Sequence, residues 1–420
     1  MHTRSVGYLE LIKGNRNFRR LWFGDIISLL GDWFNTIALY ALVEELSGSP
    51  MALGWVFMIK MGALGLASPL AGVLADRYDR RRLMIGADLL RAFVVLGFLL
   101  VDSQEDLWLL YTLIAVQIAL GSVFDPARSA SLPNITSGQE LLTANALMAS
   151  TWSTLLAFGA ALGGFAAGWF GIAPVFWIDA ATYLVSALCI LGTQIPSPAP
   201  VAPDAPPLWT VAWSKIVDGW GYLWKHPEVG RMALAKASWA SGGAALVYML
   251  AMLGPELPVE SEAIGIGLLF SARGLGTGIG PLLGRALVRD RRRWPWVIGV
   301  CLVGSGIVYG TTWLMPWTLW ITIPILVAHA ASGANWVFSS VLLQERAEDV
   351  YRGRVFATEW MMLTGMNVVS VMAASVALER GLLSLRDGML AACGVIVLAG
   401  VVWLVLVVPA ERRAVASSPP

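Results

Sequence analysis

Long apolar runs alternate along this chain with short polar segments, and each run has about the length of one bilayer crossing. A helix of about twenty apolar residues spans the hydrocarbon core of a membrane. Runs of this length lie at residues 19–43, 51–75, 83–101, 107–127, 146–170, 172–192, 231–253, 262–284, 294–314, 317–341, 355–378 and 388–408. The pattern predicts an all-α membrane protein with twelve transmembrane helices.

The composition supports a membrane protein and excludes several other classes. Of the 420 residues 57% are hydrophobic and 14% are charged, more apolar surface than an ordinary soluble core could bury. Cys189, Cys301 and Cys393 lie in three separate spans, a spacing that indicates neither disulfides nor a metal site. Because no phosphate-binding loop or nucleophile–base set appears either, we expect no enzyme activity, no cofactor, no metal and no nucleic-acid partner.

The basic residues are distributed unevenly between the two sets of loops. Most of the 29 Lys and Arg residues lie in the N-terminal segment, in the loops after even-numbered spans, in the central linker and in the C-terminal tail. Only Arg380 and Arg386 lie in the other loops, which are short and acidic. The positive-inside rule therefore predicts that both termini and the central linker are cytoplasmic.

A basic motif occurs twice, after the second and the eighth span. Gly72 and Arg77 of "GVLADRYDRRRLM" are matched by Gly284 and Arg289 of "GRALVRDRRRW", at an offset of 284 − 72 = 212. Such a repeat is typical of transporters built from two parallel halves with a site between them. It predicts two pseudo-symmetric six-helix bundles, at residues 1–195 and 231–420, joined by a cytoplasmic linker at 196–230.

The linker combines a proline-rich stretch with an amphipathic segment. Six prolines between Pro196 and Pro207 exclude a helix there and predict an extended chain. After it, Trp213, Ile216, Val217, Trp220 and Trp224 fall on one helical face. This segment is predicted to lie as a helix in the membrane interface, where Trp is favoured.

These motifs resemble the major facilitator superfamily over nearly the whole chain. The loop at residues 72–84 is similar to the superfamily signature between its second and third helices, with Asp79 in place of the usual Gly. The segments "SLLGDWFNTIAL", "FDPARSASLP", "FWIDAATYLVSAL" and "RGRVFATEW" resemble the bacterial exporter branch that includes enterobactin and macrolide efflux proteins. The resemblance implies a secondary transporter.

The resemblance also implies that the loop after the second span acts as a conformational latch. Asp76 would lie near the N-terminus of the eleventh helix and near Arg128 in the outward-open state, because a helix N-terminus and an arginine both favour a carboxylate. A simple topological signal is the alternative interpretation. The motif residues assigned to the latch are Gly72, Asp76, Arg77, Arg80, Arg81 and Arg128.

Two departures from the family pattern bear on proton coupling. Gly159, Gly163 and Gly164 in the fifth span resemble an exporter signature, but Ala160 replaces its proline. The alternative for these glycines is ordinary close packing of helices. Gln117 stands where many proton-coupled members carry an arginine, so their coupling scheme does not transfer directly.

Polar residues inside the spans are the main candidates for function, because ionisable groups at membrane depth are costly. In the superfamily the first, fourth, seventh and tenth helices line the central cavity. The resemblance therefore places near the substrate or the proton path Asp25, Asp32, Asn35, Gln117, Lys236, His329 and Asn335. Lys236 lies close to a span end, so its side chain reaching the cytoplasmic surface is an alternative.

Asp32 is the first candidate for proton coupling, with Asp25 and His329 as further candidates. A carboxyl group in the middle of a membrane is protonated more readily than one in water, which permits reversible protonation. The alternative for Asp32 is a permanent salt bridge to Lys60 or Arg91. For His329 the alternative is a hydrogen-bonded structural role.

Four further charged residues are interpreted as members of intramembrane ion pairs. Asp88 and Arg91 are three residues apart on one helix, where opposite charges neutralise each other. Lys60 and Arg273 occupy corresponding places in the two halves, and a structural ion pair is the favoured interpretation for Arg273. Asp179 receives no role.

Together these observations predict a multi-pass transporter of a bacterial cytoplasmic membrane. We expect it to export a small amphipathic compound, such as a drug, macrolide or siderophore-like molecule, by proton-coupled alternating access and as a monomer. Transport of a lipid or lysolipid is one alternative. A membrane sensor or scaffold that has lost transport is another.

Overall fold

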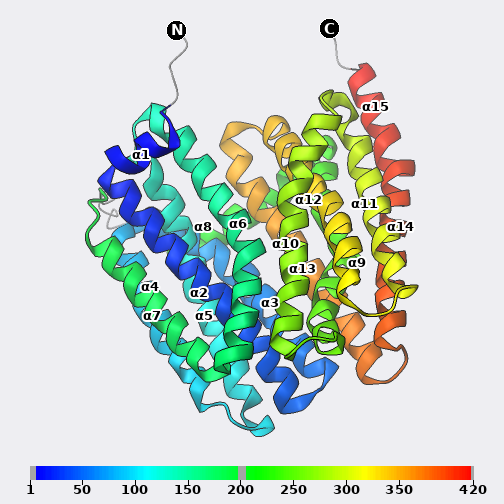
Figure 1. The fold of residues 1–420 in the computed structure, drawn as a ribbon. Coiled ribbons are helices and arrows are strands. Elements are labelled where there is room, and N and C mark those ends of the chain that lie inside the picture. Colours follow the sequence, from blue (N-terminus) through cyan, green and yellow to red (C-terminus); the bar gives the residue numbers. More distant parts are fainter. Residues whose placement is uncertain (1–5, 197–204, 418–420) are drawn as a thin grey trace.

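Twelve long helices cross the molecule in a computed structural model, which describes residues 6–196 and 205–417. Figure 1 shows them as two groups that lie side by side, with both chain ends at the same end of the molecule. The first group consists of α2 (Arg16–Ser47), α3 (Pro50–Arg77), α4 (Arg80–Gly97), α5 (Leu107–Ile135), α6 (Gly138–Phe170) and α7 (Ile172–Leu191). The second consists of α9 (Pro227–Leu253), α10 (Glu262–Leu287), α11 (Trp294–Gly310), α12 (Thr322–Arg346), α13 (Asp349–Glu379) and α14 (Leu385–Val402).

Three further helices lie outside this set. They are α1 (Tyr8–Gly14), α8 (Leu208–Lys225) and α15 (Val408–Ser417), of which α15 follows α14 after one π-helical turn at Trp403–Val407. The twelve predicted spans are thus confirmed in number and order. All elements within the described residues are helical, which confirms the predicted fold class.

Several helices extend beyond the apolar run that predicted them. The run at 107–127 becomes α5, which continues through Pro126 and Pro133 to Ile135. Hydropathy ends where the bilayer ends, but the hydrogen-bonded helix continues into polar surroundings. Apolar runs therefore locate a span but underestimate the length of its helix.

The two bundles repeat the same packing. In the first bundle α2 packs against α7, α3 against α5 and α4 against α7; in the second the equivalent contacts join α9 to α14, α10 to α12 and α11 to α14. Between the bundles, α6 packs against α10 and α3 packs against α13. Because α6 and α13 are equivalent positions of the repeat, as are α10 and α3, the seam between the bundles also follows the pseudo-symmetry.

The two ends of the molecule differ in how the bundles meet. We call the end that carries the connections at residues 78–79, 136–137, 288–290 and 347–348 the terminal face, and the end with residues 48–49, 101–103 and 257–261 the opposite face. Toward the opposite face one hydrophobic core contains buried residues of both bundles, such as Ile37 and Leu269. Toward the terminal face each bundle has a separate core, one around Phe18 and Met84 and one around Phe338. The bundles are therefore joined at the opposite face.

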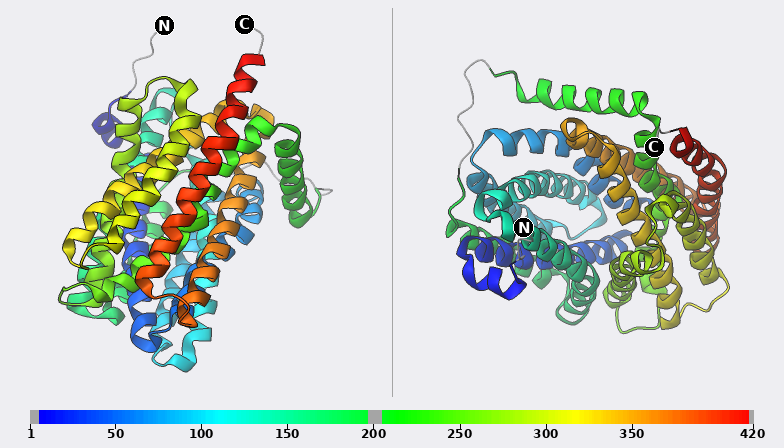
Figure 2. Two further views of the ribbon diagram at one scale, coloured as in Figure 1. Left: turned by 90° about the vertical axis from the view of Figure 1, so that its right-hand side faces the viewer. Right: turned by 90° about the horizontal axis from the view of Figure 1, so that it is seen from above.

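The linker helix α8 lies on the outside of the molecule. Figure 2 shows it running across the seam between the bundles, and it contacts α3 and α13. Its tryptophans face away from the protein, with Trp224 89% exposed and Trp213 56% exposed. An exposed Trp row suits a membrane interface. Most of the predicted proline-rich segment, residues 197–204, lies outside the described residues.

Candidate functional site

A cluster of charged side chains lies inside the first bundle at the middle of its spans. Arg91 of α4 forms an ion pair with Asp88 and lies 3.8 Å from Asp32 of α2, measured from Nη1 to Oδ2. The guanidinium also lies between the rings of Phe124 and Tyr183, at 4.9 and 4.3 Å from their centroids. Arg91 and Asp88 are almost fully enclosed, whereas the Asp32 side chain is 35% exposed. Asp32 is thus the member of this cluster that is accessible from outside it.

Hydrogen bonds extend this cluster to α5 and α7. The Tyr183 hydroxyl donates to Asp32 and accepts a hydrogen bond of 3.1 Å from the Gln117 amide. Asp179, one turn before Tyr183, is fully buried against Thr182 and Asn35, and its Oδ2 has no hydrogen-bond partner among the described residues. Three carboxyl groups therefore surround one arginine. We call Asp32, Asp88, Arg91, Asp179 and Tyr183 the carboxylate cluster.

Lys60 and Arg273 occupy a different environment from the one predicted. The Lys60 ammonium donates a 2.9 Å hydrogen bond to Thr36 Oγ1, and Arg273 lies 5.8 Å from the centroid of the Phe270 ring. Among residues 6–196 and 205–417 neither cation forms an ion pair, so the interpretation of both as members of salt bridges is wrong for this structure. The nearest helices present aromatic rings and hydroxyl groups to Arg273 instead of a carboxylate.

Asp25 and Arg128 form an ion pair near the terminal face. Arg128 also lies 3.2 Å from Asp125, so it bridges two carboxylates. Asp76, the assigned latch carboxylate, is 61% exposed at its side chain and lies 3.4 Å from Lys215 of α8. The contact between Asp76 and Arg128 is absent from the described residues in this state, and it stays a prediction for an outward-open state.

The remaining arginines of the motif tie α4 to neighbouring helices. Arg80 donates to the carbonyl oxygens of Ala75 and Ala130, at 3.1 and 2.8 Å, and Arg81 donates to the carbonyl of Ile190 at 3.3 Å. Gly72 has open space at the position of an added Cβ, and the Arg77 side chain forms no hydrogen bond with residues 6–196 or 205–417. In this state the motif thus organises the terminal end of the first bundle.

The glycines of the fifth span pack against two different helices. A Cβ added at Gly159 or Gly163 would meet Trp33 or the backbone at Phe34 of α2, in the same bundle. A Cβ at Gly164 would lie 3.0 Å from Gly267 Cα of α10, in the other bundle. Gly163 therefore permits a close helix contact inside the first bundle, and Gly164 permits one across the seam.

The predicted residues of the second bundle are buried. Lys236 forms a 3.0 Å ion pair with Glu359 of α13, at 4% and 1% side-chain exposure, so the alternative of a side chain that reaches the cytoplasmic surface does not hold in this structure. Asn335 donates to the Ala235 carbonyl at 3.4 Å. His329 is 2% exposed and makes edge contacts to Trp239 and Tyr309.

None of the four substrate-cavity candidates is accessible in this state. Asn35, Gln117, Lys236 and Asn335 are all buried. Sequence reasoning missed Glu359, although the rule that selected Lys236, a charge a few residues inside a predicted span, would also have found it. It missed the role of Tyr183 because a tyrosine in an apolar span carries no charge to attract attention.

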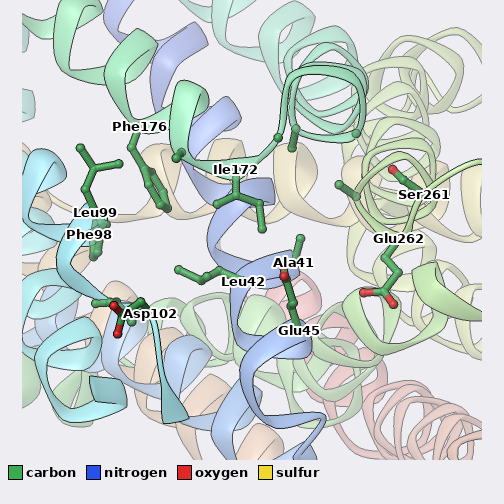
Figure 3. Close-up of a pocket in the computed structure, with 16 residues that line it drawn as sticks. Ala41, Leu42, Glu45, Phe98, Leu99, Asp102, Ile172, Phe176, Ser261 and Glu262 are labelled. Atoms are coloured by element: carbon green, nitrogen blue, oxygen red, sulfur yellow. The ribbon is translucent and has the colours of Figure 1, made fainter. Parts of the chain in front are cut away.

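A pocket of about 700 Å³ opens near the opposite face, and none of the predicted site residues lines it. Figure 3 shows its lining, which combines apolar side chains such as Leu42 and Phe176 with the carboxylates of Glu45, Asp102 and Glu262. These residues come from both bundles, since Glu262 begins α10. The pocket and the mid-span charges are therefore separate features.

Comparisons with known proteins place this geometry among membrane transporters. A model of the Major Facilitator Superfamily matches residues 21–357. The enterobactin exporter EntS of Citrobacter koseri is 24% identical over 355 residues, which cover 83% of this chain and 82% of that protein. The MFS-type transporter YfiS of Bacillus subtilis is 29% identical over 219 residues, and the match spans about half of each protein, 52% of this chain and 51% of YfiS.

Solved structures agree on the fold. A crystal structure of the peptide transporter POT superposes with a TM-score of 0.75 at 12% identity, covering 95% of each chain. The nucleoside transporter NupG gives a TM-score of 0.73 at 14% identity, covering 92% of this chain and 99% of its own. At such identities these structures support the architecture alone.

Proposed function

Because the chain belongs to the major facilitator superfamily, we propose that it exports a small amphipathic compound in exchange for protons, with its terminal face in the cytoplasm. The orientation is supported by the basic loops of the terminal face and the positive-inside rule. Export is supported by the likeness to proteins named enterobactin exporters.

In this proposal the structure is the state of an alternating-access cycle that opens toward the cytoplasm. The bundles share one core at the opposite face and have separate cores at the terminal face. Contacts across the seam also concentrate at the opposite face, where the Tyr248 hydroxyl donates to the Pro50 carbonyl at 2.6 Å. Closure of the terminal face would bring the Asp76 loop toward the other bundle, where the latch would form.

The single observation that carries the proton coupling is the position of Asp32. It is a mid-span carboxyl group with 35% of its side chain exposed, and it joins the otherwise enclosed carboxylate cluster. Three carboxylates and one arginine would leave an excess of negative charge in a medium of low dielectric constant, which is costly. A proton taken up by Asp32 removes one of those charges and weakens the attraction of Asp32 to Arg91. Proton binding would then alter the contact between α2 and α4.

Flux measurements test this function directly. Accumulation of a panel of dyes and antibiotics is measured in cells that express wild type, Asp32→Asn or the surface control Asp349→Asn, with and without a protonophore. Asp349 suits the control because its side chain is 88% exposed and lies at the start of α13. We expect wild type and the control to lower accumulation, and the protonophore or Asp32→Asn to abolish this effect.

Two results would contradict the proposal. If efflux persists with the protonophore and in Asp32→Asn, the transport is not driven by protons through this carboxyl group. If no compound moves in wild type although the protein reaches the membrane, the lipid-transport and non-transport alternatives replace export.

A further inference from the structure

Two cations that have no ion-pair partner within the described part of the chain lie at matching depths in the two bundles. Lys60 is ten residues from the start of α3 at Pro50, and Arg273 is eleven residues from the start of α10 at Glu262. At about 1.5 Å per residue both lie roughly 15 Å below the opposite face, close to the middle of a bilayer. The two positions are 273 − 60 = 213 residues apart, within one residue of the offset of 212 between the repeated motifs. They are therefore two positive charges on equivalent helices, at the depth where such transporters bind substrates.

A group of aromatic rings connects the two cations across the seam. Lys60 Nζ lies 5.4 Å from the centroid of the Tyr40 ring, Tyr40 lies 5.6 Å from Phe270, and Phe270 lies 5.8 Å from Arg273 Cζ. Phe57 stacks on the other side of Tyr40 at 4.7 Å. Phe57 precedes Lys60 by three residues, as Phe270 precedes Arg273, so each cation lies one helical turn from its ring toward the terminal face.

The side chains around Arg273 offer polar groups and aromatic rings, but within the described residues none of them is a carboxylate that pairs with it. Its guanidinium forms no ion pair and no hydrogen bond among the described residues, and its Nε is buried without a partner. Tyr40, Tyr309 and His329 are its polar neighbours, and Tyr309 Oη and His329 Nε2 also lack hydrogen-bond partners within the described residues. Lys60 has Asp32 and Asp179 only at longer range. An arginine at membrane depth is costly and is usually paired or part of a functional site.

From this geometry we propose that Arg273 and Lys60 form an anion-binding site, and that the transported compound is an amphipathic organic anion. The anionic group would pair with Arg273, assisted by Lys60, and its apolar body would extend from the cations toward the terminal face, because the rings of Tyr40, Phe57 and Phe270 are buried against one another. Arginine suits this role because its planar donors match a carboxylate or sulfonate in two hydrogen bonds. The inference deepens the function proposed above and rests on it for the claim that the bound anion is also transported.

Partial exposure supports access to these cations. Lys60 and Arg273 are neither buried nor fully exposed, whereas the aromatic residues Tyr40 and Phe270 on their opposite-face side are 4% and 2% exposed. The rings thus close the seam toward the opposite face, and the cations face the end where the bundles have separate cores. A soluble organic anion and an anionic lysolipid share the required chemistry, and the experiment below distinguishes them.

Binding to three compounds with one ring system tests the charge preference. The full chain is purified into nanodiscs of zwitterionic lipid, and isothermal titration calorimetry measures binding of 2-naphthoate, naphthalene-2-carboxamide and (naphthalen-2-yl)methylammonium. Variants are Arg273→Gln, Arg273→Lys and Lys60→Gln. Arg285→Gln is the matched control, because it makes the same change at an exposed position of the same helix.

We expect wild type and Arg285→Gln to bind 2-naphthoate at least about tenfold more tightly than the carboxamide, the ratio that one charge-assisted contact supplies. The ammonium compound should bind most weakly. Arg273→Gln should remove the preference for the anion, Lys60→Gln should reduce it, and Arg273→Lys should retain part of it. If Arg273→Lys keeps part of the preference for the anion, the loss of that preference in Arg273→Gln reflects the lost charge and not misfolding.

The proposal is overturned if naphthoate does not bind, if the three compounds bind equally, or if Arg273→Gln keeps the preference. Displacement of naphthoate by lysophosphatidylglycerol at far lower concentrations would overturn the assignment to a soluble anion and assign the site to lipid. These titrations need no proton gradient. Anion binding without proton-dependent efflux would thus contradict the proposed function alone, and proton-dependent efflux without anion preference would contradict this inference alone.

Discussion

Arg91 and Arg273 are both mid-span arginines, one in each bundle, but their surroundings are opposite. Arg91 is enclosed, forms an ion pair with Asp88 and lies 3.8 Å from Asp32. Arg273 has aromatic and hydroxyl neighbours and no carboxylate partner among the described residues. The same chemical group is therefore neutralised inside one bundle and left unpaired at the seam.

This difference indicates a division of labour between two halves that share one fold. The first bundle contains an excess of carboxyl groups that is suited to binding protons. The second bundle contributes to the seam a positive charge that is suited to binding an anion. The repeat pairs α4 with α11 and α10 with α3, so the two mid-span arginines occupy different places in one repeated fold.

The largest expected effect comes from removing the neutralised arginine. Arg91→Gln leaves Asp88 and Asp32 without their cation in an enclosed site, and breaking a buried pair in this way costs about 3 to 5 kcal/mol. We expect a large fall in the melting temperature of the purified protein, followed by loss of its monodisperse size-exclusion peak. Adding Asp88→Asn to Arg91→Gln should recover part of the loss, since it removes the charge left unpaired.

Arg273→Gln is the counterpart of that change in the other bundle. It removes a charge with no partner, so we expect the melting temperature to stay at the wild-type value or to rise. An equal fall for Arg91→Gln and Arg273→Gln would break the comparison, because it would show that Arg273 is also held by a stabilising contact.

A smaller effect should separate contacts inside a bundle from contacts at the seam. Gly163→Ala crowds the backbone of Phe34 within the first bundle, whereas Gly164→Ala crowds Ala263 and Gly267 of α10. Overpacking costs about 1 to 3 kcal/mol. At Gly164 that cost falls on the state with a closed opposite face, so the equilibrium should shift roughly 5- to 150-fold toward its opening.

Spin labels at Glu105 and Glu260 report this shift, because both are exposed and lie at the opposite face of different bundles. Pulsed distance measurements should show a longer distance in Gly164→Ala and an unchanged one in Gly163→Ala. Gly86→Ala in α4 is the control for an added methyl group in open space. Equal distances in all variants would show that the α6–α10 contact does not control closure.

The fold could be predicted from the sequence because it depends on patterns along the chain and not on which side chains meet. Apolar length gave the spans, and the repeated motif at Gly72 and Gly284 gave the two bundles. Helix ends were less accessible, as at α5, because hydrogen bonding continues where hydropathy stops.

For the candidate site, only the types of residue involved could be predicted from the sequence. Asp32, Arg91 and Arg273 stand out as charges within apolar runs, but which of them meet depends on the rotation of each helix. Arg273, which has no ion-pair partner among the described residues, and Lys236, which pairs with Glu359, therefore look alike in sequence.

The smallest effect is expected where a charge pair is exposed. Lys215 of α8 lies 3.4 Å from Asp76, and their side chains are 42% and 61% exposed. Water screens such a pair, which typically contributes about 0.2 to 1 kcal/mol. Lys215→Gln should therefore change the melting temperature far less than Arg91→Gln, and the difference should shrink further in high salt. A fall in melting temperature as large as that of Arg91→Gln would show that pairing, and not burial, decides how much a charge contributes to the stability of this protein.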